Sequence, residues 1–220
     1  MFTGFSQQTS DFLWGLTFNN ERSWFLEHKN EFEEHLMTPF KALADDVFDV
    51  VQQRHGDMGM NMHISRIYRD ARRLHGRGPY KDHLWFSIKN WDGLLCGPMF
   101  WFEIGAADCG YGMGFYSATA AQMEQFRRGV DANPARLERL AERLNAQSEF
   151  FLEGPEYKRP KGDAGELLNP WYNRKWLGLC CRMDFGEELF DASLVKRITD
   201  GYEFLMPYYD YFMGICEPEE

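Results

Sequence analysis

The sequence predicts an α+β protein, a single domain in which an antiparallel sheet is packed by N-terminal, central and C-terminal helices. Helical periodicity fills the first 53 residues and returns after residue 119, strand-like alternation lies between these regions, and regular β-α-β alternation is absent. The 220 residues are 44% hydrophobic and 26% charged, which is typical of a globular chain and excludes collagen, coiled coil and disorder. We predict one domain over residues 1–216, with a frayed acidic tail at 217–220.

The N-terminal region predicts three helices. An apolar stripe containing Phe12, Leu13 and Leu16 marks the first. Asn20 is expected to cap the second, because its short side chain can accept a hydrogen bond from a first-turn amide. Pro39 is placed to start the third, because proline is well tolerated at the first helical position.

The middle of the chain predicts the sheet. Tyr80 to Lys89 alternates between apolar and polar residues, as a half-buried strand does. Glycines in the last part of a predicted hairpin are expected either to weaken its second strand or to let another backbone approach closely; they are Gly110, Gly112 and Gly114. The further predicted strands are Ile64–Asp70, the hairpin Met99–Ile104 with Tyr111–Tyr116, and Trp176–Phe185.

Three more helices follow. Thr119 and Gln122 have the spacing of a capping box, which predicts a helix start. Pro134 is expected to begin the next helix, and Ser193–Met213 to form a closing helix with Pro207 kinking it.

The net charge of −10 is unevenly distributed, because two basic segments stand in an otherwise acidic chain. Residues 54–89 hold 8 basic and 3 acidic residues, and residues 158–175 hold 5 and 2. An acidic protein is a poor general binder of nucleic acid, whose affinity depends on phosphate neutralisation. The charge pattern therefore disfavours nucleic acid and directs attention to the two segments.

Cysteine usage and hydropathy set the expected compartment. The five cysteines are odd in number and form no Cys-x-x-Cys pair, so we expect buried free thiols, with no disulfide framework, metal site or cofactor. No run of about 18 apolar residues and no basic leader are visible, which predicts a cytoplasmic protein without a membrane partner.

Arginines concentrate in the first basic segment, and their planar forks bind carboxylate or phosphate bidentately. We predict an anion-binding cluster with tyrosines nearby as proton-transfer candidates. In a strand only some of these side chains would share a face, and the alternative is that the arginines form structural ion pairs. The predicted anion-binding residues are Arg66, Arg69, Arg72 and Lys81, and the catalytic candidates are Tyr68, Tyr80 and His28.

Other charged residues complete the candidate list. Lys158 and Arg159 lie in the second basic segment, in a stretch that Pro160 keeps extended, and would close over the anion if the two segments met. His28 has helical spacing to Glu31 and His35, but no further strong ligand group is spaced to join these three, so we predict no metal site. Glu103 is the one charge in an apolar strand; it either pairs with an arginine or acts as a tuned acid/base group.

Four blocks of the sequence resemble a family of uncharacterised bacterial and fungal proteins, the domain-of-unknown-function family 2461. The blocks are Asn19–Lys29, Arg66–Arg72 with Pro79–Lys81, Gly112–Tyr116 leading into Gln122–Arg127, and Leu152–Pro160. This sequence departs from the family pattern at Arg73 and at Arg77–Gly78. The resemblance implies a single α+β domain and no particular activity. It marks these positions for testing: Trp24, Lys29, Arg66, Arg69, Asp70, Arg72, Tyr80, Lys81, Lys158 and Arg159.

Three functional hypotheses remain open from the sequence. The first is a pocket for a phosphorylated or carboxylated small molecule, with or without catalysis. The second is a non-catalytic module that docks acidic protein or nucleic acid through an exposed basic face. The third is a purely structural basic network. A pocket needs converging cations that lack carboxylate partners, whereas a structural network has each guanidinium already paired.

Overall fold

The computed structural model describes residues 1–70, 72, 74, 76–90, 97–116 and 118–216. The predicted acidic tail at 217–220 lies outside this part of the chain. The fold divides into two compact units. Unit 1 contains Met1–Ile88, Trp101–Tyr111 and Arg182–Asp200, and unit 2 contains Lys89–Phe100, Gly112–Cys181 and Gly201–Glu220.

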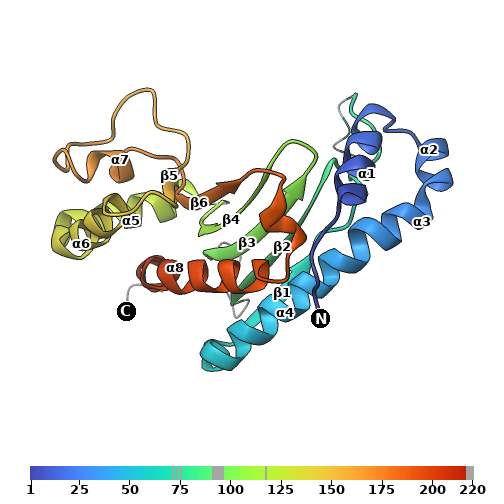
Figure 1. Cartoon of the computed structure of the whole chain (residues 1–220). Coiled ribbons are helices and arrows are strands. Elements are labelled where there is room, and N and C mark those ends of the chain that lie inside the picture. The colour runs from blue at the N-terminus through green and yellow to red at the C-terminus, as the bar shows by residue number, and fades with distance from the viewer. Residues whose placement is uncertain (71, 73, 75, 91–96, 117, 217–220) are drawn as a thin grey trace. The chain divides into compact units, whose positions relative to one another are not determined.

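A six-stranded antiparallel sheet with helices before, within and after it confirms the α+β class (Figure 1). The strand order is β1-β2-β3-β4-β6-β5, so β1 and β5 form the two edges. The strands are β1 Met60–Ile64, β2 His83–Asn90, β3 Met99–Gly105, β4 Cys109–Gly114, β5 Phe151–Glu153 and β6 Gly178–Met183. The predicted hairpin and the predicted strand around residue 180 are confirmed with small changes of boundary.

The helices also follow the predicted order. They are α1 Gln7–Phe18, α2 Arg22–Glu27, α3 Lys29–Glu31, a π-helical segment Phe32–Met37, α4 Thr38–His55, α5 Ala120–Ala132, α6 Pro134–Asn145, α7 Asn169–Tyr172 and α8 Leu194–Cys216, with short 3₁₀ turns at Gly56–Met58 and Glu187–Phe190. The capping box of Thr119 and Gln122 and the first-position Pro134 are confirmed. Pro207 lies inside α8.

Two local predictions were wrong. Asn20 does not cap α2, whose N-cap is Glu21, because the Asn20 side chain bonds the backbone of Tyr80 instead. The predicted strand Ile64–Asp70 is also not formed, because the first strand ends at Ile64. The Ser65 amide still donates to the Trp85 carbonyl at 2.8 Å, but the Ser65 hydroxyl, in place of a backbone carbonyl, accepts the Trp85 amide. Pairing then continues only as an isolated bridge between Tyr68 and Tyr80.

Strand alternation separates the two sides of the sheet within unit 1. Phe86 and Phe102 are fully buried, and the ring of Phe40 from α4 packs against both at 5.8 and 6.1 Å. Successive side chains of a strand point to opposite faces, so Trp85 and Glu103 lie on the other face. That second face carries the polar groups described below.

Unit 2 has a core built around aromatic residues of α8. Tyr209 stacks on Phe100 at 5.0 Å, and the Tyr208 hydroxyl donates to the carbonyl of Leu140 at 2.9 Å. Burial raises the pKa of Tyr208 to about 12, so this hydroxyl stays protonated as a donor. Along the whole of α8, apolar residues spaced three, four or seven positions apart are buried, as expected for one face of a helix; they are Leu194, Ile198, Leu205, Tyr209 and Phe212.

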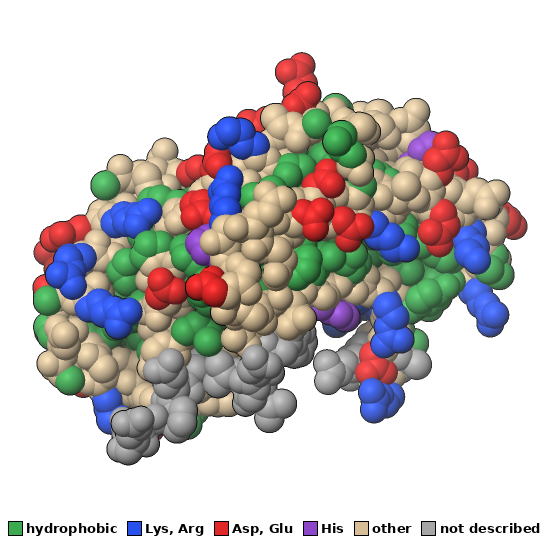
Figure 2. All heavy atoms as spheres, turned by 90° about the horizontal axis from the view of Figure 1, so that it is seen from below, with side chains coloured by type: hydrophobic (Ala, Val, Ile, Leu, Met, Phe, Trp, Pro, Cys, Tyr) green, Lys and Arg blue, Asp and Glu red, His purple; other side chains and the backbone are tan. Residues whose placement is uncertain are grey.

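Charged groups of both signs are mixed on the face of the molecule that Figure 2 shows. On the face drawn in Figure 2, acidic and basic side chains are interspersed, with hydrophobic side chains visible between them. Cys109, Cys180 and Cys181 are buried, as predicted. In the described part of the chain, no helix is long and apolar enough to cross a membrane.

Candidate functional site

The first basic segment is held against the start of β2 by backbone pairing. The Arg69 amide donates to the carbonyl of Pro79 at 2.8 Å, and the Lys81 amide donates to that of Ile67 at 2.7 Å. Tyr68 and Tyr80 form an isolated antiparallel bridge between these two hydrogen bonds. This pairing fixes which cationic side chains approach one another.

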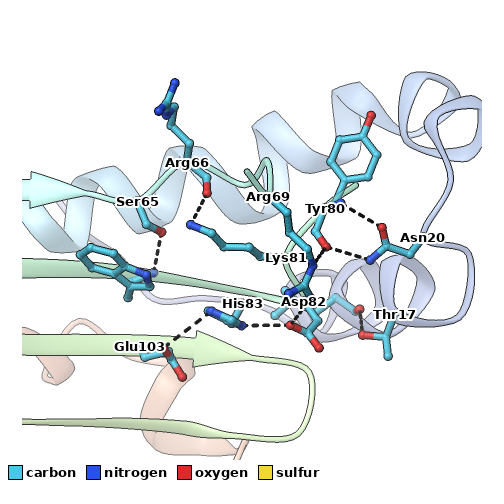
Figure 3. Close-up of polar contacts among 12 residues, drawn as sticks. Thr17, Asn20, Ser65, Arg66, Arg69, Tyr80, Lys81, Asp82, His83 and Glu103 are labelled. Atoms are coloured by element: carbon cyan, nitrogen blue, oxygen red, sulfur yellow. Dashed lines mark hydrogen bonds and ion pairs between the residues drawn. The ribbon is translucent and has the colours of Figure 1, made fainter. Parts of the chain in front are cut away.

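Tyr80 is the buried centre of this segment. Its ring stacks on Phe25 at 4.1 Å, and Asn20 bonds both its amide and its carbonyl at 3.0 Å (Figure 3). Burial, reinforced by Tyr68, raises the pKa of the Tyr80 hydroxyl, although Arg22 opposes the shift. Tyr80 therefore has a structural position, whereas the Tyr68 side chain is 57% exposed.

Two of the predicted anion-binding arginines are already occupied. The Arg69 Nε donates to the Tyr80 carbonyl at 2.6 Å, and its Nη2 pairs with Asp82 at 3.2 Å. Arg72 donates to both carboxylate oxygens of Asp70, at 3.0 and 2.8 Å, and this hydrogen bond raises the pKa of the Arg72 guanidinium. Both contacts match the structural alternative rather than a free anion cradle.

Lys81 and Arg66 are different. The Lys81 Nζ donates to the backbone carbonyl of Arg66 at 2.7 Å and lies 5.8 Å from the centroid of the Trp85 ring. Neither Lys81 nor the exposed Arg66 side chain forms an ion pair with any described carboxylate, and the Arg66 guanidinium points away from the network in Figure 3. Burial, then the charges of Arg69 and Arg66, lower the pKa of Lys81, with Glu103 opposing them. The ammonium is thus partly desolvated beside other cations.

His83 lies two residues further along, on the same face of β2. Its Nδ1 lies 2.9 Å from an Asp82 oxygen and its Nε2 lies 4.0 Å from a Glu103 oxygen on β3 (Figure 3). Asp82 therefore orients the imidazole, while the longer gap to Glu103 leaves Nε2 without a direct hydrogen bond to that carboxylate. Sequence reasoning placed His83 on the polar face of the strand but did not single it out.

The two carboxyl groups around His83 differ in acidity. Burial tends to raise the pKa of Asp82, but its own backbone amide, the His83 ring and Arg69 outweigh burial, so this pKa is lowered. Burial raises the pKa of Glu103; His83 and Arg182 oppose the shift, and Asp108 and Asp82 add to it. A pair of carboxyl groups with separated pKa values beside one histidine is an arrangement suited to proton transfer.

A hollow of about 130 Å³ opens beside this histidine. Asp82, His83 and Glu103 line one part of it, and Trp14 and Thr17 of α1 contribute another. The turn between β3 and β4 completes the lining with Gly105, Ala106, Ala107 and Asp108. Asp82, Glu103 and Asp108 make the hollow itself unfavourable for an anion. Lys81 is therefore the more favourable position for an anionic group.

The remaining predicted residues have surroundings of their own. The His28 ring stacks on Trp24 at 4.0 Å, and its Nδ1 lies 2.9 Å from the Trp24 carbonyl oxygen. Lys158 and Arg159 are exposed residues of unit 2, whereas the cluster described above belongs to unit 1. Among the residues that the structure describes, no three His, Cys, Asp or Glu side chains gather as metal ligands would.

Comparison with known proteins places the chain in a family without assigning a reaction. A family model described as "Conserved hypothetical protein (DUF2461)" matches residues 8–211. The chain belongs to this family. The match spans both units, and it agrees with the resemblance carried by the blocks around Trp24 and Arg66. No curated protein matches the chain.

Proposed function

We propose that the protein binds a small molecule carrying a phosphate or carboxylate group on the second face of the unit 1 sheet. The anion is held by Lys81, and the exposed Arg66 side chain, which points away from Lys81 in the structure, turns toward it when the ligand binds; the rest of the ligand extends toward His83 and the hollow beside it. The observation that carries the proposal is the environment of Lys81: a partly desolvated ammonium with no described carboxylate partner, whose pKa the positive charges of Arg69 and Arg66 lower further. An incoming anion relieves this unbalanced positive charge.

The same arrangement supports a proton-transfer role for His83. Asp82 fixes the ring orientation, and Nε2 faces Glu103 across a gap of 4.0 Å. A ligand atom to one side of this gap, about 2.8 Å from each group, is within hydrogen-bond reach of both a base and an acid whose pKa burial has raised. We therefore propose binding as the primary function, with His83 and Glu103 as the candidates for chemistry.

The test is calorimetric titration of the full chain with a sugar phosphate and with a dicarboxylate, comparing Arg66→Ala with the wild type. Arg66 is exposed and without an ion pair to any described carboxylate, so its removal should leave stability within about 0.5 kcal/mol. Affinity should fall about tenfold, since a hydrogen bond to a charged group contributes about 1.5–3 kcal/mol. Lys41→Ala, which removes an equal charge from the exposed side of α4, should leave affinity unchanged.

Arg72→Ala separates this proposal from a general basic cluster. Its guanidinium is held by Asp70, so we expect its removal to change affinity less than twofold. Binding that depends equally on Arg66, Arg72 and Lys41 would show non-specific attraction and would refute the proposed site. Absence of binding to either compound at millimolar concentration would refute it as well.

A further inference from the structure

A second group of cations gathers around one aromatic ring in unit 2. The Lys161 Nζ lies 4.6 Å from the centroid of the Tyr157 ring, the Arg127 Cζ lies 5.8 Å from it, and the Lys175 Nζ lies 5.9 Å from it. The three side chains come from α5, from the loop after Tyr157 and from the segment before β6. Folding therefore brings cations from three separate segments close to one electron-rich ring.

These cations lack the acidic partners that neighbouring groups have. None of the three forms an ion pair with a described carboxylate, whereas the nearby Arg174 pairs with Glu156 at 3.6 Å. Asp131 lies one turn after Arg127 on α5, but it accepts the Tyr172 hydroxyl at 3.0 Å instead and forms no ion pair with Arg127. The group thus has positive charge that the described part of unit 2 does not neutralise.

Arg127 provides an independent sign that an acceptor is missing. Its Nη1 is buried, and no hydrogen-bond acceptor among the described residues reaches it. Buried donors are nearly always hydrogen-bonded, and leaving a charged one unpaired is costly. An oxygen atom of a ligand would supply the acceptor, and the exposed side chains of Lys161 and Lys175 can move to admit it.

The backbone around the ring is fixed before any ligand arrives. Asn173 accepts the Tyr157 amide through its carbonyl at 2.9 Å and the Lys161 amide through its side chain at 2.6 Å. Gly154 has φ of 132°, and a side chain there would clash with the Trp176 carbonyl oxygen. A rigid backbone with exposed lysine side chains suits a preformed anion site.

We infer that Arg127, Lys161 and Lys175 form a site around Tyr157 for a tetrahedral oxyanion, namely the phosphate group of a small phosphomonoester. The exposed Lys158 and Arg159 lie next to this site along the chain and strengthen its positive field. All of these residues belong to unit 2, so the site is independent of the one proposed in unit 1.

The test follows inorganic phosphate binding to the ¹⁵N-labelled full chain by NMR, using the backbone amides of Tyr157 and Lys161. These signals should shift and saturate in the wild type. Lys161→Ala and Lys175→Ala should each weaken phosphate binding about fivefold to tenfold, because each removes one charged contact. Arg139→Ala, an equal charge loss at an exposed position on α6, should change it less than twofold, and so should Lys81→Ala in unit 1.

A phosphomonoester such as glycerol phosphate and a single-stranded oligonucleotide distinguish the sources of the phosphate group. The inference requires glycerol phosphate to compete with inorganic phosphate at the same amides. The inference would be overturned if phosphate binding were weakened equally by Lys161→Ala, Lys175→Ala and the control Arg139→Ala. It would also be overturned if the oligonucleotide bound while neither phosphate nor glycerol phosphate changed the amide signals.

Discussion

The role of each cation in the first basic segment depends on the nearest carboxylate. Arg69 and Arg72 are neighbours in sequence of Arg66, yet each has an aspartate within 3.2 Å, and Arg66 has no ion pair with a described carboxylate. A paired guanidinium contributes to the scaffold, whereas an unpaired one remains available to a ligand. The functional assignment therefore moves from the whole cluster to Arg66 and Lys81.

Glu103 offers a test of electrostatics at the scale of a single residue. Burial raises its pKa in the native state above the ordinary value of 4.5, so the native state holds the proton more tightly than the unfolded chain. Stability contributed by this group is present below the unfolded pKa and decreases as pH rises through the native one. We expect Glu103→Gln to gain stability relative to the wild type between pH 4 and pH 7, by up to about 1 kcal/mol because the group is partly exposed.

Urea denaturation of both proteins across that pH range measures the difference. Glu142→Gln, at an exposed position on α6, is the control for the removal of one carboxyl group. A Glu103→Gln difference that does not vary with pH, or that falls with pH, would contradict the assigned direction of the pKa shift.

Sequence reasoning identified part of this site and missed part of it for a physical reason. Arg66 and Lys81 are visible as charge in a local segment, and Glu103 is visible as a charge in an apolar strand. The approach of Glu103 to His83 depends on the pairing of β2 with β3, and the bonds of Asn20 to Tyr80 span 60 residues. Neither partner could be chosen without the register of the sheet.

Among the elements, β4 depends on a close approach to its neighbour β6. A side chain at Gly112 would lie 2.2 Å from the Leu179 carbonyl oxygen, and one at Gly114 would lie 2.6 Å from Gly178 and Leu177. The sequence left two explanations for these glycines, a weak strand or an approaching backbone. The distances at Gly112 and Gly114 establish the second.

Two glycine substitutions of opposite sign test this explanation. Gly112→Ala should destabilise the chain by at least about 2 kcal/mol, because strand backbone cannot move aside as a flexible side chain can. Gly129→Ala should stabilise it by about 0.5–1 kcal/mol, since this glycine lies within α5 and an added Cβ meets nothing within 4 Å. Unfolding free energies from denaturant titration give both values. A neutral Gly112→Ala would show that the two strands can separate without cost.

The helices and strands with strong local signals were predictable, and those that depend on tertiary partners were not. The Thr119 capping box and the first-position Pro134 are signals contained in a few residues, and both helices begin as expected. The segment after Ile64 has strand-like residues but forms only an isolated bridge, since the Ser65 side chain, in place of a backbone carbonyl, accepts the Trp85 amide. Local propensity cannot anticipate that exchange of a backbone acceptor for a hydroxyl.

At the scale of the whole molecule, the division into two units runs through the strands. The boundary between the units falls inside four strands, because β2, β3, β4 and β6 each contain residues of both units. A unit whose strands continue into the other cannot lose its hydrogen bonding without affecting the continuing strands. We therefore propose that the chain behaves as one domain in folding, with a single cooperative transition.

Urea titration followed by NMR tests this, using amide signals of α4 in unit 1 and of α6 in unit 2. Both helices should share one midpoint in the wild type. Asn20→Ala removes two hydrogen bonds from unit 1 and should lower stability by about 1–3 kcal/mol, shifting the midpoint of α6 as much as that of α4. Gly112→Ala, which lies in unit 2, should likewise lower the midpoints of both α4 and α6. Separate midpoints for α4 and α6 in the wild type would show two independently folding domains. So would a variant that shifts the midpoint only of the helix in its own unit, because equal shifts require strands that transmit unfolding from one unit to the other.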